Sequence, residues 1–358
     1  MPPKLSALLL VLLVFSNCQK DSPNTPTTTP NNPAITNTFW QTDEPTNHGF
    51  SAATIEKVIT EADQLNNFYA LLIIRHKKLL VEAYFENRNT NTLFELRSVT
   101  KNITSALAGI AVEKKWINGV DEPIYTYFPN VNMTGQKRNI TFEHLLNMSS
   151  GLSWDEDRDV LNLIQQRIPN SVNHLLSQPL VNPPGTVFDY NSLSPHVVGE
   201  VLRQQTNLSL SELAQRELFD PMDIAPFSWN TDPEGRNWGG FGLLLTARDL
   251  AKFGQLYLNE GAWEGQQIVP AEWVQQSSKR QIFTSSTGYS YQWWVSTQSE
   301  TPLYYGQGFG GQGLILLPEK EVIIVALQEA WIPPSVASQQ WNNFVTKVFN
   351  PILEELEK

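Results

Sequence analysis

The hydrophobic pattern divides the chain into two strand-rich parts that flank a long, mostly helical part. An N-capped amphipathic helix is predicted over 51–65, followed by a hairpin of strands at 69–74 and 79–85. Helical spacing then dominates from about residue 116 to residue 253. The C-terminal part predicts strands and one closing helix, at 289–295, 303–308, 313–317, 322–327 and 335–356. We therefore predict an α+β fold, in which both ends of the chain form one antiparallel sheet flanked by helices and the middle is inserted.

Ser98 and Lys101 form an S-x-x-K motif at the start of a predicted buried helix. Apolar or small residues follow with the spacing of one helix face, at Ile103, Ala106, Leu107, Ile110 and Ala111. A lysine near the core loses part of its preference for the charged form, so it can accept a proton near neutral pH. The pair is a candidate nucleophile and base, although a surface helix with an ordinary serine and lysine would give the same motif.

A second candidate is Tyr190, which lies where a turn-forming segment at 183–186 leads into a helical pattern through residue 202. A phenol beside a lysine ammonium is pushed towards phenolate, and a phenolate can take the proton of a serine hydroxyl. The alternative is a packed aromatic ring whose hydroxyl has found a partner.

A glycine-rich segment at 306–312 directly precedes a predicted strand. Glycine in a strand marks the close approach of another group, and that group can be a substrate. A backbone N–H of this strand would then join that of Ser98 in holding an oxyanion. The alternative is a glycine-rich bulge at a sheet edge.

In this order, the three segments resemble the motifs of the serine β-lactamase and penicillin-binding protein superfamily, in its class C and esterase-like branch. The similarity runs from about residue 50 to the C-terminus and includes 140–152 (ITFEHLLNMSSGL) and 239–254 (GGFGLLLTARDLAKFG). It implies a β-lactamase/transpeptidase-like fold and an acyl-enzyme mechanism. By this resemblance Ser98 is the acylated nucleophile, Lys101 and Tyr190 are the proton-transfer pair, and the backbone N–H groups of Ser98 and Phe309 form the oxyanion hole.

Two positions depart from the superfamily motifs. The second motif of the superfamily is Tyr-x-Asn, and this chain has Tyr190-Asn191-Ser192 in its place. The hydroxyl of Ser192 therefore replaces a carboxamide that commonly contacts the substrate amide. Lys-Thr-Gly is represented by Gly306-Gln307-Gly308, so the cation that attracts the carboxylate of penicillins is missing. Both departures resemble esterases and aminohexanoate-oligomer hydrolases of the superfamily. We predict that Ser192, Gln307 and Gly308 contact the substrate, and that it is a small ester or amide.

Composition narrows the partners further. The 358-residue chain has a formal net charge of −11, which disfavours nucleic acid as a partner. The five histidines lack metal-ligand spacing, so no metal and no cofactor is predicted. Most of the eleven tryptophans are expected in the core, and one or two in a pocket for the acyl or leaving group. The tryptophans that the resemblance places near the cleft are Trp154, Trp238, Trp293, Trp294 and Trp331, of which Trp238 is predicted to contact the substrate.

The N-terminus resembles a bacterial lipoprotein signal. An apolar run at 5–15 is too short to span a bilayer, which takes about 20 residues, and it ends at the sequence FSNC, where Cys18 is the only cysteine. We predict a signal peptide over 1–18 with lipidation at Cys18, a Thr/Pro/Asn-rich flexible tether over 19–42, and a hydrolase domain over 43–358. The expected location is membrane-anchored, in the periplasm or at the cell surface. A signal peptide cleaved elsewhere is the alternative.

Three classes of function fit these residues. The first is a serine hydrolase of small esters or amides. The second is a β-lactamase or D-alanyl-D-alanine carboxypeptidase-like cell-wall enzyme, which the missing third-motif lysine disfavours. The third is a binding homologue without catalysis, which the presence of Ser98, Lys101 and Tyr190 together disfavours.

Overall fold

A computed structural model describes residues 39–296 and 301–358. Its centre is a nine-stranded sheet in the order β1-β3-β2-β14-β13-β12-β11-β10-β9. All neighbouring strands are antiparallel except β1 and β3. Its strands are β1 (Gln41–Thr42), β2 (Phe68–Arg75), β3 (Lys78–Tyr84), β9 (Ile282–Phe283), β10 (Gly288–Ser290), β11 (Trp293–Val295), β12 (Tyr304–Gly308), β13 (Gln312–Leu317) and β14 (Val322–Gln328).

The two ends of the chain meet in the middle of this sheet, where β2 pairs with β14 in a register that places Ile73 opposite Ile324. Every residue of β14 is buried, and so is every residue of β2 except Arg75. Strands that are apolar on both faces require a cover on both sides of the sheet. The sheet is therefore the middle layer of three.

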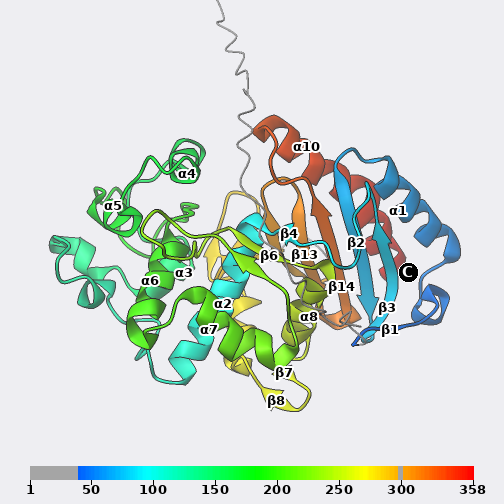
Figure 1. Cartoon of the computed structure of the whole chain (residues 1–358), viewed down its shortest axis with the longest axis horizontal. Helices are drawn as coiled ribbons and strands as arrows, with labels where there is room; N and C mark the ends of the chain where they lie inside the picture. The colour runs from blue at the N-terminus through cyan, green and yellow to red at the C-terminus, as the bar shows by residue number, and fades with distance from the viewer. Residues whose placement is uncertain (1–38, 297–300) are drawn as a thin grey trace, which may run out of the picture. The chain divides into compact units, whose positions relative to one another are not determined.

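One face is covered by α1 (Ala52–Gln64), α10 (Pro334–Phe344) and α11 (Asn350–Leu356), which form a core with β2, β13 and β14. The other face is covered by α8 (Ala247–Leu258) (Figure 1). A Cβ atom at Gly254 of α8 would lie 3.0 Å from side-chain atoms of both Ile323 and Leu314. The glycine thus lets the helix approach the sheet closely.

Between β3 and β9 the chain forms short helices and two small sheets. The helices are α2 (Thr100–Glu113), α3 (Phe142–Leu146), α4 (Glu156–Ile164), α5 (Ser171–Ser177), α6 (Ser194–Thr206), α7 (Leu210–Ala214), α8 and α9 (Ala271–Ser277). The small sheets contain β4 (Phe94–Glu95), β6 (Leu243–Leu245) and β5 (Ser228–Trp229), and β7 (Ala262–Trp263) with β8 (Gln266–Gln267). Among the described residues, none of these helices has the length and apolar character needed to span a bilayer.

The predicted strands and the closing helix are found, and the structure differs from the sequence prediction at three places. The segment 289–295 is a tight hairpin of β10 and β11 rather than one strand, because Tyr291 and Gln292 adopt positive φ angles of 42° and 71°. The closing helix is interrupted by a π-helical turn at 345–349, just before Pro351, which lacks an N–H to donate. The predicted tether reaches residue 42, whereas Gln41–Thr42 already forms β1. Cys18 and residues 1–38 lie outside the described residues.

The glycines of β12 bring this strand against the segment that carries Ser98. A Cβ atom at Gly306 would lie 2.2 Å from Asn102 Oδ1, and one at Gly308 would lie 2.5 Å from Leu96 O. On the side where these Cβ atoms would lie, the group that approaches the glycines is the protein itself. Among the described residues, β12 pairs with β13 from Tyr304 to Gly308 but with β11 only at Tyr304 and Tyr305, so the substrate contacts predicted for Gln307 and Gly308 stay predictions.

We predict that Gly306→Ala destabilises the protein by about 1–3 kcal/mol, because the added methyl group must push β12 away from α2. Urea unfolding of the purified domain measures this change. Gln307→Ala, one position further along β12, is the control and should unfold within about 0.5 kcal/mol of the wild type. Equal stabilities for Gly306→Ala and the wild type would contradict the close approach.

Candidate active site

Ser98 lies in a 3₁₀ turn, η2 (Arg97–Val99), directly before α2. The preceding residue, Arg97, has a φ of 48°, a left-handed conformation that is strained for a residue with a side chain. Its buried guanidinium donates hydrogen bonds to Ala330 O from Nε at 3.1 Å and from a terminal nitrogen at 2.5 Å. The link between Arg97 and the segment after β14 therefore supports the strained turn that presents Ser98.

Lys101 is buried on the first turn of α2, with 1% of its surface exposed. Its Nζ lies 2.8 Å from Ser98 Oγ, 3.2 Å from Ser192 Oγ and 3.0 Å from Gly240 O. Burial lowers the pKa of Lys101 to about 8, even though the negative charge of Glu156 acts in the opposite direction. A lysine in this state can take the proton of Ser98 near neutral pH.

Tyr190 lies beside this pair, with its ring centroid 4.9 Å from Lys101 Nζ and a side-chain hydrogen bond to Ser98. Burial raises the pKa of Tyr190, the charge of Glu156 raises it further, and the hydrogen bond to Ser98 lowers it only in part. The expected push towards phenolate is therefore wrong. Tyr190 is a neutral phenol here, so Lys101 is the better base of the two.

The other predicted site residues are only partly brought together. Ser192 is 2% exposed and contacts Lys101. Gln307 and Gly308 end β12, and Gly308 packs against the turn that carries Ser98. Phe309 follows at the tip of the hairpin, with its ring 5.7 Å from the Arg97 guanidinium and 41% of its surface exposed. The oxyanion hole at Ser98 and Phe309 stays a prediction.

Two of the tryptophans expected near the cleft, Trp238 and Trp294, differ in their surroundings. Trp238 is only 5% exposed, because it packs against His196 and stacks on Phe241. Trp294 instead stacks on Tyr190 at a centroid distance of 5.7 Å. Trp238 therefore has little surface to offer a substrate, whereas Trp294 supports the ring of a candidate proton-transfer residue.

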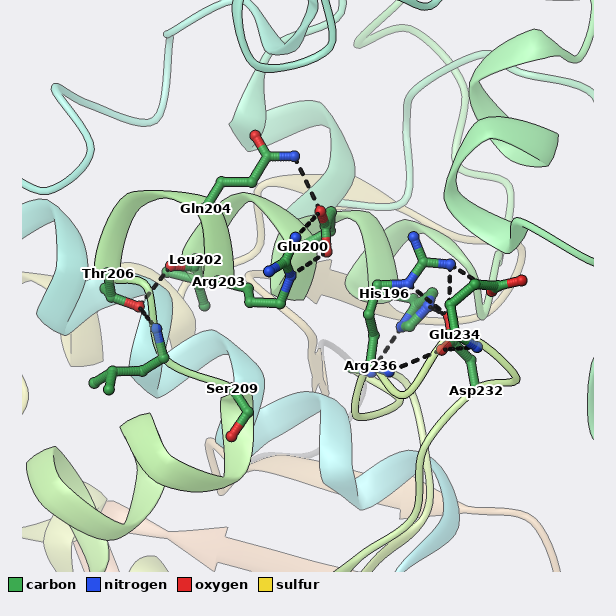
Figure 2. A network of polar contacts seen from close by, with 12 residues as sticks. His196, Glu200, Leu202, Arg203, Gln204, Thr206, Ser209, Asp232, Glu234 and Arg236 are labelled. Carbon is green, nitrogen blue, oxygen red and sulfur yellow. Dashed lines mark hydrogen bonds and ion pairs between the residues drawn. The ribbon is translucent and has the colours of Figure 1, made fainter.

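Gly240, an acceptor for Lys101 that sequence reasoning missed, is held by a network behind the site. Figure 2 shows His196 of α6 beside Asp232 and Arg236. His196 Nε2 lies 3.1 Å from Asp232 Oδ2, and the backbone N–H of Gly239 donates to His196 Nδ1 at 3.4 Å. Burial raises the pKa of Asp232, but the hydrogen bonds from His196 and from the backbone of Arg236 leave it well below its usual range. An ionised Asp232 thus fixes the imidazole that supports the Gly239–Gly240 backbone.

Glu156 is the second residue that the sequence did not reveal. It begins α4, accepts hydrogen bonds from Ser192, and influences the pKa of both Lys101 and Tyr190. Nothing in the spacing of residues 155–159, a run of charges at a helix start, separates this glutamate from its neighbours. Within the described part of the chain, no group of three histidine, cysteine or acidic residues is placed to hold a metal ion.

A model of the β-lactamase family matches residues 66–344. The chain belongs to the β-lactamase family. The 6-aminohexanoate-dimer hydrolase of Paenarthrobacter ureafaciens is 24% identical over 314 residues, which cover 80% of this chain and 78% of that protein.

Two solved structures share the fold. A protein from Bacillus anthracis named as a candidate 6-aminohexanoate-dimer hydrolase superposes with a TM-score of 0.74 and 21% identity, covering 89% of this chain and 88% of that one. EstCE1, a hydrolase with promiscuous acyltransferase activity, superposes with a TM-score of 0.69 and 16% identity, covering 86% and 99%. The β-lactamase/transpeptidase-like fold predicted from the sequence is confirmed.

The lowered pKa of Lys101 predicts the pH dependence of acylation. The reactive form of Lys101 is neutral, so kcat/KM should rise about tenfold per pH unit below about pH 8 and level off above it. Lys101→Arg should lose at least 100-fold, because a guanidinium keeps its proton throughout this range. The measurement is kcat/KM for one ester from pH 5 to pH 10. A flat profile, or an active Lys101→Arg enzyme, would contradict the role of Lys101 as the base.

Proposed function

We propose that this serine hydrolase acts through an acyl-enzyme on small, uncharged esters or amides. The observation that carries the proposal is the 2.8 Å contact between Ser98 Oγ and the buried amine of Lys101, in a chain of the β-lactamase family. The names of its relatives support both bond types, since one is an amide hydrolase and another is EstCE1, a hydrolase with acyltransferase activity.

In the proposed reaction, Ser98 Oγ attacks the substrate carbonyl carbon while its proton passes to Lys101 Nζ. The tetrahedral intermediate collapses when the bond to the leaving alcohol or amine breaks. The proton held by Lys101 then reaches the leaving group, and the neutral phenol of Tyr190, hydrogen-bonded to Ser98, is placed to pass it on. Water repeats the sequence on the acyl-enzyme, releasing the acid and restoring Ser98.

The charges around the site favour a neutral substrate. The position of the third-motif cation is occupied by Gly306-Gln307-Gly308. Arg97 directly precedes Ser98, but its guanidinium donates hydrogen bonds to Ala330 O, and its Nε lies 3.6 Å from Glu95 Oε1. A substrate carboxylate would therefore meet no free cation from β12 or from the turn that carries Arg97. The charge-assisted hydrogen bond that it lacks is worth about 1.5–3 kcal/mol of binding free energy.

Exposed aromatic rings against Arg97, the residue before the nucleophile, favour an apolar group on the substrate. Phe309 and Trp331 are 41% and 61% exposed, and the Trp331 ring is centred 3.9 Å from the Arg97 guanidinium carbon. Rings held on a fixed arginine offer an apolar surface at little cost in side-chain entropy. A short acyl chain fits this surface better than a charged peptide end.

The test compares kcat/KM for a butyryl ester, a neutral butyryl anilide and a chromogenic cephalosporin on one preparation. We expect the ester to exceed the cephalosporin by at least tenfold, with Ser98→Ala inactive on all three. A cephalosporin that is the better substrate by more than tenfold would overturn the neutral-substrate proposal and favour the cell-wall or β-lactamase alternative. Activity of Ser98→Ala within about tenfold of the wild type would overturn the nucleophile assignment.

We also propose that the protein is anchored to a membrane by a lipid on Cys18. The support is the sequence alone, with an apolar run of signal-peptide length that ends at the single cysteine. In a bacterial host fed an alkyne fatty acid, the wild type should be labelled and pellet with membranes, whereas Cys18→Ala should be unlabelled. An unlabelled wild type would show that the signal is cleaved elsewhere.

A further inference from the structure

Glu156 and Ser192 form a hydrogen-bonded pair next to Lys101. The hydroxyl of Ser192 donates to Glu156 Oε1, and the backbone N–H of Ser192 donates to Glu156 Oε2 at 2.9 Å. A third donor, Trp154 Nε1, reaches Oε2 at 2.7 Å. The carboxylate is therefore held in one orientation by three donors, two of them on Oε2.

This arrangement fixes the direction of the next hydrogen bond. A serine hydroxyl has one hydrogen, and Ser192 gives it to Glu156, so Ser192 Oγ can only accept from Lys101 Nζ. The carbonyl of Gly240 is also an acceptor only. A neutral amine has two N–H groups and one lone pair. With both N–H groups taken by Ser192 and Gly240, the lone pair faces the third neighbour, Ser98 Oγ.

We propose that Glu156 is a positioning residue for acylation, which sets the polarity of the Ser192 hydroxyl and thereby aims the lone pair of Lys101 at Ser98. This inference rests on the proposed function of Ser98 and Lys101. It also changes the role of Ser192, which is 2% exposed and has already given its only proton to Glu156. Ser192 orients the base instead of contacting the substrate.

The charge of Glu156 adds a separate effect. It stabilises the ammonium form of Lys101 and so opposes the effect of burial on its pKa. Removing that charge must lower the pKa of Lys101, which moves the acid limb of the rate profile to lower pH. The two effects of Glu156 can therefore be measured separately. The direction of the Ser192 hydroxyl changes the rate at the high-pH plateau, whereas the charge of Glu156 changes the pH at which the rate begins to fall.

Glu156→Gln separates these effects, because it keeps the shape of the side chain. The amide oxygen is expected to face the two N–H donors that now meet Oε2, which turns the amide NH₂ towards Ser192 Oγ. The Ser192 hydroxyl must then donate towards Lys101 and occupy its lone pair. We expect the plateau rate to fall about 10- to 100-fold and the acid limb to move to lower pH.

The readout is the second-order rate of Ser98 labelling by a fluorophosphonate probe from pH 5 to pH 10, which needs no natural substrate. Asp157→Asn is the matched control, because it removes the same charge from the adjacent, exposed position of α4. Its profile should match that of the wild type. A wild-type protein that is labelled at Ser98 but hydrolyses no ester or amide would reject the proposed substrates. The labelling rates of the wild type and Glu156→Gln would still decide the role of Glu156.

A second background tests the polarity directly. Ser192→Ala removes the hydroxyl, so Glu156→Gln should then cost less than about threefold at the plateau while still shifting the limb. Ser192→Thr keeps the hydroxyl and should retain more activity than Ser192→Ala. The proposal is overturned if Glu156→Gln labels within twofold of the wild type at the plateau, or if it costs the same in both backgrounds.

Discussion

The burial of one amine determines how the site is built. Taking a lysine out of water is costly unless its amine finds hydrogen-bond partners, and Lys101 finds them on three separate segments. These are the turn before α2, the loop before α6 and the loop before β6. Each segment alone would leave the amine unsatisfied. Satisfying Lys101 therefore requires all three segments to be in place, so the geometry needed for catalysis and the hydrogen bonds needed for stability are the same contacts.

The remainder of the molecule holds those three segments at fixed distances. On one side, Gly306 and Gly308 bring β12 against the turn of Ser98, and Arg97 ties the same turn to the segment after β14. On the other side, Gly239 and Gly240 approach α6, since Cβ atoms there would lie 2.1 Å from Pro195 O and 2.5 Å from Ser192 O. The nearest neighbour is a backbone oxygen at Gly308, Gly239 and Gly240 and the side chain of Asn102 at Gly306, so none of these contacts leaves room for a Cβ atom. The large sheet supports the nucleophile, and α6 supports both acceptors of the base.

Sequence reasoning recovers what depends on periodicity and on adjacent residues. The strands β2, β12, β13 and β14 follow from apolar runs, and the pair of Ser98 and Lys101 follows from helical spacing, as the structure places them. It fails where the outcome depends on three-dimensional neighbours. The pKa of Tyr190 moves opposite to expectation because burial and the charge of Glu156 outweigh the hydrogen bond to Ser98, and neither burial nor Glu156 is visible in the local sequence. Trp238 is indistinguishable from Trp294 by composition, yet only Trp294 stacks on Tyr190.

The two departures from the family motifs have one physical explanation. A carboxamide carries its donor and acceptor on separate atoms, whereas a hydroxyl offers both from one oxygen, so a serine at position 192 needs a neighbour that fixes its hydrogen. Glu156 supplies that neighbour and brings a negative charge close to the reacting atoms. In a site without a lysine on β12, this charge disfavours an anionic substrate further, because no cation from that strand offsets it. A hydroxyl that is oriented by a carboxylate and a preference for neutral substrates are therefore expected to occur together.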